Sequence, residues 1–202
     1  GYHVITDGEF RRSYWHLDFM WGLNGIKEIE LDHGYFFHGE ETTHGSAEVT
    51  GKISGENHPF VEDYKFVKQI EDENTVAKQT IPAPAQTYLQ FTVPGSIEQT
   101  RKFYATDDEL IEDIASAYRD VIAQFYEAGC RNLQLDDCSW GSALTEGGTE
   151  IFGVSADEYK NRLLKVNNLA LEGKPEDMVI TSHICRGNYH STYFSSGAYT
   201  PV

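Results

Sequence analysis

The sequence is short of cysteine, of basic residues and of long apolar runs, and each shortage excludes a class of protein. Its three cysteines, odd in number and widely spaced, do not form a disulfide framework, and they favour a reducing, cytoplasmic setting. Lys and Arg number 16 against 32 Asp and Glu, and the net charge of -16 argues against nucleic acid or an anionic membrane as a partner. No apolar run approaches the roughly 18 to 20 residues that span a bilayer, and no secretory signal pattern opens the chain.

The chain of 202 residues has the size of one domain and can bury a sizeable core. Its first residues, His3 to Thr6, read as a strand in mid-fold, and Thr200-Pro201-Val202 ends the sequence without a closing element. We therefore expect a piece of a longer protein. The oligomeric state stays open, and a homo-oligomer is compatible with the sequence.

Helical and strand patterns alternate along the chain. Thr106 with Glu109, and Ser155 with Glu158, form two capping boxes, each followed by apolar residues at helical spacing. Such alternation predicts an α/β fold with a parallel sheet, and a (β/α)8 TIM barrel is favoured because no strand is followed by a dinucleotide-binding glycine fingerprint. Only about four of the eight barrel strands are visible, so this sequence covers the barrel in part. The expected strands lie at residues 3–6, 76–80, 132–135 and 178–182.

Residues 1–202 are expected to form part of a single barrel domain, with a β-hairpin insertion at residues 23–78, after the first visible strand. Within the insertion, apolar residues alternate with polar ones, and glycine and histidine punctuate them. No pair of histidines in this segment has a metal-ligand spacing on a clear helix or strand, so we interpret them as exposed loop residues. They are His33, His38, His44 and His58.

Polar side chains follow the predicted parallel strands. Asp7 and Glu9 follow the first strand, Asp136 ends a later one, and His183 and Cys185 stand at the end of the last. Because the carboxyl ends of parallel strands share one face, where a barrel builds its active site, we expect these side chains to meet. An alternative role for Asp7 is to cap a helix, and the functional interpretation is favoured mainly for Glu9.

The histidine and cysteine two residues apart at a strand end project to the same side, where imidazole nitrogen and thiolate sulfur suit zinc. Zinc deprotonates a bound thiol near neutral pH, and Glu9 with Asp136 would suit the ammonium group of an amino-acid substrate, unless one serves as a general base. Cys138 is a candidate third ligand. The competing interpretation makes His183 a core histidine and Cys185 a small buried hydrophobe.

Three segments of the sequence resemble the cobalamin-independent methionine synthase family, in particular its short single-barrel bacterial members and the catalytic C-terminal half of the full enzyme. The resemblance implies a (β/α)8 barrel and zinc-dependent methyl transfer from a methylated folate to homocysteine, which yields methionine. After Asp136 the full-length synthases carry Glu-Pro-Ala, where this chain has Asp-Cys-Ser. The segments are residues 6–12, 133–137 and 182–188.

By position, the resemblance makes His183 and Cys185 two of the zinc ligands, and Glu9 and Asp136 the residues that hold the amino group of homocysteine or methionine. The family's other ligands, a glutamate and a second cysteine, and its catalytic proton donor are expected beyond Val202. Two alternatives stay open: alkyl transfer to another small thiol such as coenzyme M, and an inactive barrel fragment that binds a ligand or a partner.

Two aromatic residues near these segments are further candidates. Trp140 and Tyr193 could stack on a flat substrate, and packing within the protein is the alternative for both.

Overall fold

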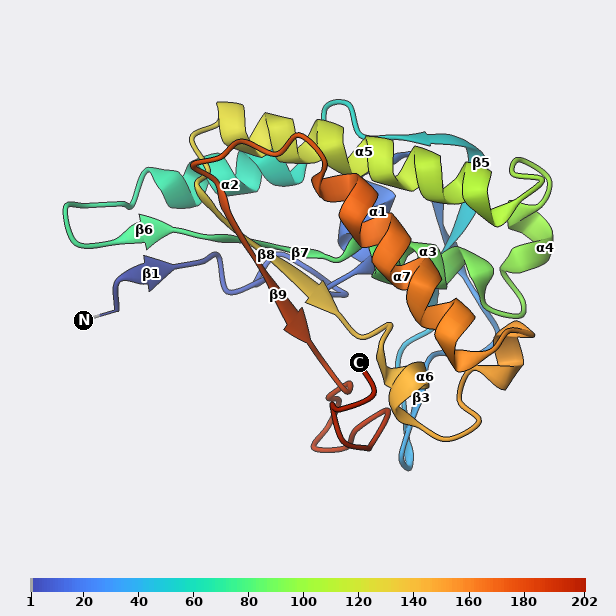
Figure 1. Cartoon of the computed structure of the whole chain (residues 1–202). Helices are drawn as coiled ribbons and strands as arrows, with labels where there is room; N and C mark the ends of the chain where they lie inside the picture. The colour runs from blue at the N-terminus through green and yellow to red at the C-terminus, as the bar shows by residue number, and fades with distance from the viewer. Residues whose placement is uncertain (1) are drawn as a thin grey trace.

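Parallel strands form the frame of the protein in the computed structural model, which describes residues 2–202. Strand β1 (Val4–Ile5) pairs with β6 (Val76–Ala77), and a single residue separates β6 from β7 (Gln79–Pro82). Strand β7 pairs with β8 (Asn132–Asp137), which in turn pairs with β9 (Val179–Ile184). All of these pairings are parallel, so the carboxyl ends of the strands lie at one edge (Figure 1).

The burial pattern of the strands separates a central pair from an edge. All four residues of β7 are buried, and β8 alternates between buried and half-buried positions. Because successive side chains of a strand point to opposite faces, Leu133, Leu135 and Asp137 share the buried face, while Gln134 and Asp136 share the other. Strand β9 is largely exposed, as expected for a strand with one neighbour in the described part of the chain.

Three helices pack together against the buried face of the sheet: α3 (Pro84–Thr92), α5 (Asp107–Glu127) and α7 (Ala156–Leu171). Both predicted N-caps are confirmed, because Thr106 Oγ1 and Ser155 Oγ each accept a hydrogen bond, at 3.2 Å, from the amide of the glutamate three residues on. The apolar stripe of α5 is fully buried between the sheet and its neighbours. The remaining helices are short: α1 (Leu17–Trp21), α2 (Phe60–Lys68), α4 (Ile97–Thr100), α6 (Gly141–Leu144) and the 3-10 helix η1 (Glu150–Phe152).

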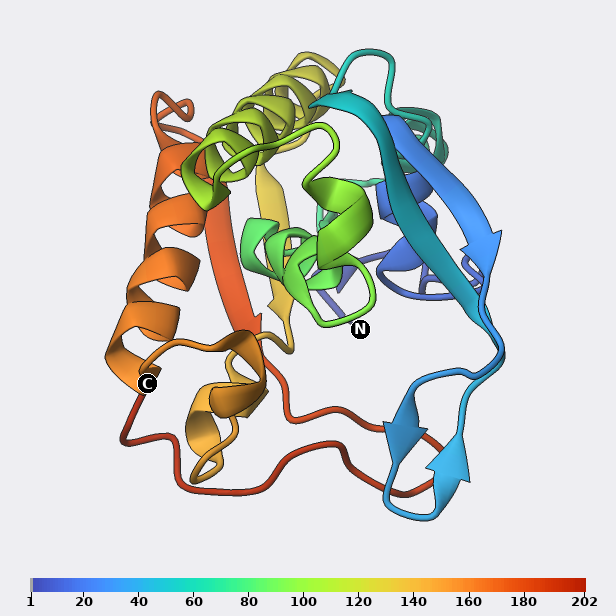
Figure 2. The same cartoon turned by 90° about the vertical axis from the view of Figure 1, so that its right-hand side faces the viewer.

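A long antiparallel pair leaves the frame after α1. Strands β2 (Asn24–Glu30) and β5 (Gly45–Ser54) form the ribbon, and β3 (Phe36–Phe37) and β4 (Glu40–Glu41) form a smaller hairpin at its tip. Figure 2 shows this ribbon on the opposite side of the molecule from α7, with α3 and α4 between them. Residues 23–78 also contain α2, which contacts β6 and α5, and the status of the whole segment as an insertion stays a prediction.

One histidine of this segment differs from expectation. His33, His38 and His44 are exposed, whereas His58 is 2% exposed and belongs to the core. Its Nε2 lies 2.9 Å from the Phe19 carbonyl oxygen, and its ring stacks on the Phe19 ring. The expectation of an exposed loop residue is therefore wrong for His58, because α1 and α2 close over it, and no local sequence pattern reports that contact.

The α/β class predicted from the sequence is confirmed, with helices and small sheets arranged around parallel strands. Between residues 2 and 202 these strands form an open series, so the closed eight-stranded barrel stays a prediction. Over the same residues no helix combines the length and the apolar character needed to cross a membrane.

Candidate active site

The ends of β8 and β9 bring three of the predicted site residues together. Asp136 lies opposite His183 in the β8–β9 pairing and opposite Pro82 in the β7–β8 pairing. The pairing continues past the strand ends, where the Cys185 amide donates to the Asp137 carbonyl at 2.8 Å. The alternation of the strands therefore places Asp136, His183 and Cys185 on the same face of the sheet.

The turn after β1 presents Glu9 through two consecutive left-handed residues, Gly8 at φ 64° and Glu9 at φ 58°. The Gly8 amide donates to Thr6 Oγ1 at 3.0 Å, and the Glu9 amide donates to Asp7 Oδ1 at 2.9 Å. Left-handed backbone is uncommon for a residue with a side chain, and these two bonds stabilise it here together with backbone bonds from Phe10 to Asp7 and from Arg12 to Glu9. Asp7 does not cap a helix, because the next helix begins only at Leu17.

Two side chains, Thr80 and Arg12, fix the Glu9 carboxylate. Of these, only Arg12 lies in a segment that the sequence singles out, residues 6–12. Thr80 Oγ1 donates to Glu9 Oε1 at 2.9 Å, and Arg12 Nη1 lies 3.4 Å from the same oxygen. Arg12 also donates to the carbonyls of Thr80 at 2.7 Å and Trp15 at 3.3 Å, and it lies over the Phe60 ring. With 4% of its side chain exposed, Arg12 is anchored and positions Glu9.

Asp136 is half-buried, and its pKa lies above the ordinary carboxyl range. Burial is the main cause and the negative charge of Glu9 adds to it, whereas a hydrogen bond from Gln134 and the charges of His183 and Arg12 act in the opposite direction. Gln134 Nε2 donates to Asp136 Oδ1 at 2.6 Å. Since Glu9 and Asp136 repel each other here, a cation bound between them would lower the free energy of the ionised pair.

The thiols of Cys138 and Cys185 are neighbours at the ends of β8 and β9. A hydrogen bond from the Cys138 thiol lowers the pKa of Cys185 to about 5, and the Gly187 amide and His183 act in the same direction, against the effect of burial. The pKa of Cys138 is raised by the same hydrogen bond and by burial. The favoured arrangement is a Cys185 thiolate that accepts a hydrogen bond from the Cys138 thiol.

A complete metal centre is not built from residues 2–202, because no three His, Cys, Asp or Glu side chains among them are placed to hold an ion. Cys138 therefore does not complete a ligand set with His183 and Cys185. The donor types of that pair, one imidazole and one thiolate, fit zinc, but their number falls short of the three protein ligands that a catalytic zinc commonly has. Their role as metal ligands stays a prediction.

The two aromatic residues considered for stacking on a substrate have partners within the protein. Trp140 is buried, and its Nε1 donates to Asp137 Oδ2 at 2.9 Å. Asp137 also accepts from the Ser139 amide at 2.9 Å, and burial raises its pKa. The Tyr193 ring lies 4.3 Å from that of His38, between centroids. Packing is the interpretation that these contacts support for both Trp140 and Tyr193.

The tip of the antiparallel ribbon is joined to the loop after β9 (Figure 2). Phe37 packs against Tyr189 and Phe194, and His38 Nδ1 lies 2.7 Å from the Tyr193 carbonyl oxygen. We call this contact between Phe37 and His38 on one side and Tyr189, Tyr193 and Phe194 on the other the clasp. The loop side of the clasp follows Cys185 directly, so it borders the candidate site.

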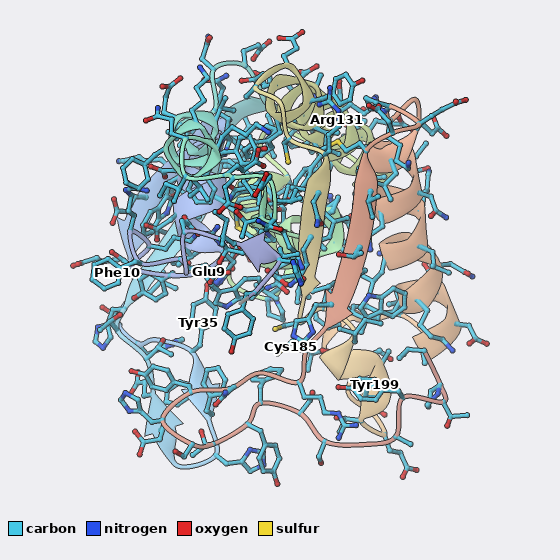
Figure 3. The ribbon with its side chains drawn as sticks, turned by 90° about the vertical axis from the view of Figure 1, so that its left-hand side faces the viewer. Glu9, Phe10, Tyr35, Arg131, Cys185 and Tyr199 are labelled. Atoms are coloured by element: carbon cyan, nitrogen blue, oxygen red, sulfur yellow. The ribbon has the colours of Figure 1, made fainter. Side chains whose placement is uncertain are left out.

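Tyr35 is a further side chain at this end of the strands that sequence reasoning did not find. In the view of Figure 3, Tyr35 lies between Glu9 and Cys185. Its hydroxyl donates to Gln90 Oε1 at 2.8 Å, and burial raises its pKa to about 12. Burial therefore keeps the Tyr35 hydroxyl neutral while it donates to Gln90.

Known proteins resemble the chain over nearly its whole length. No protein-family model matches it. Two Bacillus subtilis (strain 168) proteins of uncharacterised function are similar to it in sequence. YxjG is 39% identical over 203 residues, and YxjH is 40% identical over 205. These matches cover 98% and 100% of this chain and 52% of each relative, so the chain spans about half the length of the curated relatives it matches.

Two solved structures resemble the chain as well. One is a provisionally named vitamin B12-independent methionine synthase from Listeria monocytogenes, 38% identical, with a TM-score of 0.70 over 94% of this chain and 51% of its own. The other, from Shewanella sp. W3-18-1, is a B12-independent methionine synthase solved with selenomethionine. It is 21% identical, with a TM-score of 0.60 over 93% of this chain and 47% of its own, and it shows likeness of fold. B12-independent methionine synthases are the chain's structural neighbours.

Proposed function

We propose that this chain carries the thiol-binding part of a zinc-dependent methyltransferase that acts on homocysteine. The names of its structural neighbours, B12-independent methionine synthases, support the proposal. The observation that carries the proposal is the meeting of two carboxylates with His183 and Cys185 at one edge of a parallel sheet. In this proposal the whole protein closes a (β/α)8 barrel around that edge, and a methylated folate donates the methyl group.

Glu9 and Asp136 are proposed to bind the substrate's ammonium group. Arg12 and Thr80 fix the Glu9 carboxylate. The raised pKa of Asp136 reflects the free energy needed to keep the Asp136 carboxylate ionised while it is partly buried beside Glu9. An ammonium group between the two carboxylates offsets that cost. A hydrogen bond to a charged group is worth about 1.5 to 3 kcal/mol, so each carboxylate is expected to contribute roughly 10- to 100-fold in affinity.

His183 and Cys185 are proposed as two of the zinc ligands, with the others supplied by the rest of the full-length protein. Zinc, when bound, lowers the pKa of a coordinated substrate thiol so that the thiolate is available near neutral pH. This chain's own contribution is to hold the two donors. The Cys185 amide donates to the Asp137 carbonyl, which fixes the backbone of Cys185 at the strand end.

Metal content of the full-length protein tests the ligand assignment. Elemental analysis should give about one zinc per chain, since such sites bind tightly. Cys185→Ser and His183→Asn should both lose the metal. Cys130→Ser is the matched control, because Cys130 is buried at the opposite end of β8 and should keep it. A Cys185→Ser protein that retains a full equivalent of zinc would overturn the assignment.

Calorimetric titration tests the substrate. Homocysteine should bind with release of a proton from its thiol. Glu9→Gln and Asp136→Asn should weaken that binding roughly 10- to 100-fold without loss of zinc. The deamino analogue of homocysteine, which lacks the ammonium group, should bind the wild type and both variants equally. Tighter binding of coenzyme M would identify a different thiol acceptor, and absence of binding by any thiol would indicate an inactive barrel.

A further inference from the structure

We propose that Cys138 and Cys185 form an oxidisable dithiol, which a peroxide converts into an intramolecular disulfide. The three cysteines of the chain are all free, and these two differ from the third in their position. Cys130 is buried at the start of β8, with its sulfur 3.4 Å from the Asn132 carbonyl oxygen. Cys138 and Cys185 are partly exposed at the carboxyl ends of adjacent strands.

The register of β8 and β9 places these two cysteines side by side. Asp136 is paired with His183 and Asp137 with Ile184, so the next residues in the same parallel register are Cys138 and Cys185. The bond from the Cys185 amide to the Asp137 carbonyl, at 2.8 Å, shows that the register continues to that point. Neighbouring strands lie roughly 4.7 to 4.9 Å apart. That spacing falls within the range of about 4.4 to 6.8 Å that disulfides span between Cα atoms.

Side-chain direction and local freedom also favour the bond. Residues opposite each other in a parallel pair project to the same face, so the register places both thiols on the same side of the sheet. Each cysteine stands at the point where a strand gives way to a loop, and Gly187, in a left-handed conformation at φ 78°, follows Cys185 by two residues. A loop of this kind can absorb the small backbone shift that a disulfide requires.

The chemistry balances with hydrogen peroxide as the oxidant. The sulfur of one cysteine attacks a peroxide oxygen, the O–O bond breaks, and a sulfenic acid and one water form. The second thiol attacks the sulfenic sulfur, the S–S bond forms, and its oxygen leaves as a second water with the thiol proton. Two thiols are oxidised by two electrons and one peroxide is reduced. A dithiol reductant reverses the step by exchange through a mixed disulfide.

The consequence for the metal rests on the proposed function. A Cys185 sulfur held in a disulfide is no longer a thiolate ligand, so oxidation is expected to release zinc and to stop methyl transfer until the protein is reduced. Zinc on Cys185 should in turn slow the oxidation. The pair would make the candidate site sensitive to peroxide and recoverable by thiols.

Peptide mapping gives a direct test, because trypsin places each cysteine in a separate peptide. Cys138 lies in residues 132–160, Cys185 in 166–186 and Cys130 in 120–131. After treatment of the full-length protein with hydrogen peroxide, mass spectrometry without reduction should find 132–160 joined to 166–186, and dithiothreitol should separate them. Cys138→Ser should abolish the joined peptide completely, and Cys130→Ser should leave it unchanged. Released zinc, followed with a chromophoric indicator, should return to the protein upon reduction.

Two outcomes would overturn the inference: separate sulfinic acids on Cys138 and Cys185 with no joined peptide, or a joined peptide that involves Cys130. The result is independent of the proposed function. A protein without zinc or methyl transfer can still show the joined peptide, and a zinc-loaded, active protein can fail to show it. In the first case only the consequence for the metal is lost.

Discussion

Two adjacent aspartates show how environment separates a carboxyl group that is satisfied within the protein from one that is left available. Asp137 is fully buried, but the Ser139 amide and the Trp140 indole donate hydrogen bonds to it. Its carboxylate oxygens are therefore satisfied by the loop that follows β8. Asp136 has one donor, Gln134, and faces the negative charge of Glu9. An incompletely satisfied carboxylate at a strand end is available to a ligand. The sequence shows two identical residues there, and only their opposite faces on β8 distinguish them.

His58 is expected to make the protein sensitive to acid. Burial lowers its pKa from 6.5 to about 4, so the folded protein holds the neutral ring. The stability that depends on the neutral form is present above pH 6.5 and is lost as the pH falls towards 4. At 1.36 kcal/mol for each pKa unit, the loss is roughly 3 kcal/mol. Urea unfolding of the wild type and His58→Gln between pH 7.5 and pH 4 should show a flatter dependence in the variant.

The exposed His33 provides the control for that experiment. His33→Gln should keep the pH dependence of the wild type, since its ring is not transferred from water upon folding. His16 is also buried and its pKa is lowered to about 3, so some loss of stability with acid should persist in His58→Gln. An unchanged slope in His58→Gln would show that other groups determine the acid sensitivity.

Among the elements, those with local signals were predicted and those with distant partners were not. The N-caps of α5 and α7 depend on residues three apart, and the alternation of the ribbon depends on residues two apart. The clasp joins residues 155 positions apart in the sequence, as between His38 and Tyr193. No periodicity carries that information, because aromatic side chains on two loops can pack in many combinations.

The clasp is expected to hold the ribbon tip against the loop that follows Cys185. Phe37→Ala removes the ring that packs on Tyr189 and Phe194, so amide hydrogen exchange should accelerate in residues 34–41 and 187–195. The rest of the protein should exchange at its original rate, because the hairpin has few other contacts. Phe36→Ala is the matched control, since the Phe36 side chain is 59% exposed and its ring packs on His33 of the ribbon. Equal effects of the two variants would exclude the clasp as the link.

On the scale of the whole molecule, the sequence predicted that the strands run parallel and that the polar side chains stand at one edge of them. This was possible because the end of a strand can be located from the sequence alone. Asp136, His183 and Cys185 stand at strand ends that a parallel sheet must align. It did not predict how Arg12 fixes Glu9, because those contacts run through Thr80, 68 residues away from Arg12. The pairing of Cys138 with Cys185 likewise required the register, which the sequence leaves open by one or more residues.

The excess of negative charge is expected to make the thermal stability of the protein depend on salt. A formal net charge of -16 opposes the compact state through self-repulsion, and salt screens that repulsion. Salt also weakens surface ion pairs, but each of these contributes only about 0 to 1 kcal/mol. We therefore expect sodium chloride at about 0.5 M to raise the thermal midpoint at pH 8, by roughly 2 to 4 °C for each kcal/mol gained.

Measuring the thermal midpoint near the isoelectric point distinguishes the screening of charge repulsion from a general salt effect. At pH 5, close to the sequence pI of about 4.8, the net charge is small, so little repulsion remains for salt to screen. The gain seen at pH 8 should therefore be nearly absent at pH 5. An equal gain at both values would mean that salt acts through burial of apolar surface, as ions excluded from the protein surface do. A fall in the midpoint at pH 8 would mean that surface ion pairs such as that between Lys65 and Glu62 outweigh the repulsion among the excess negative charges.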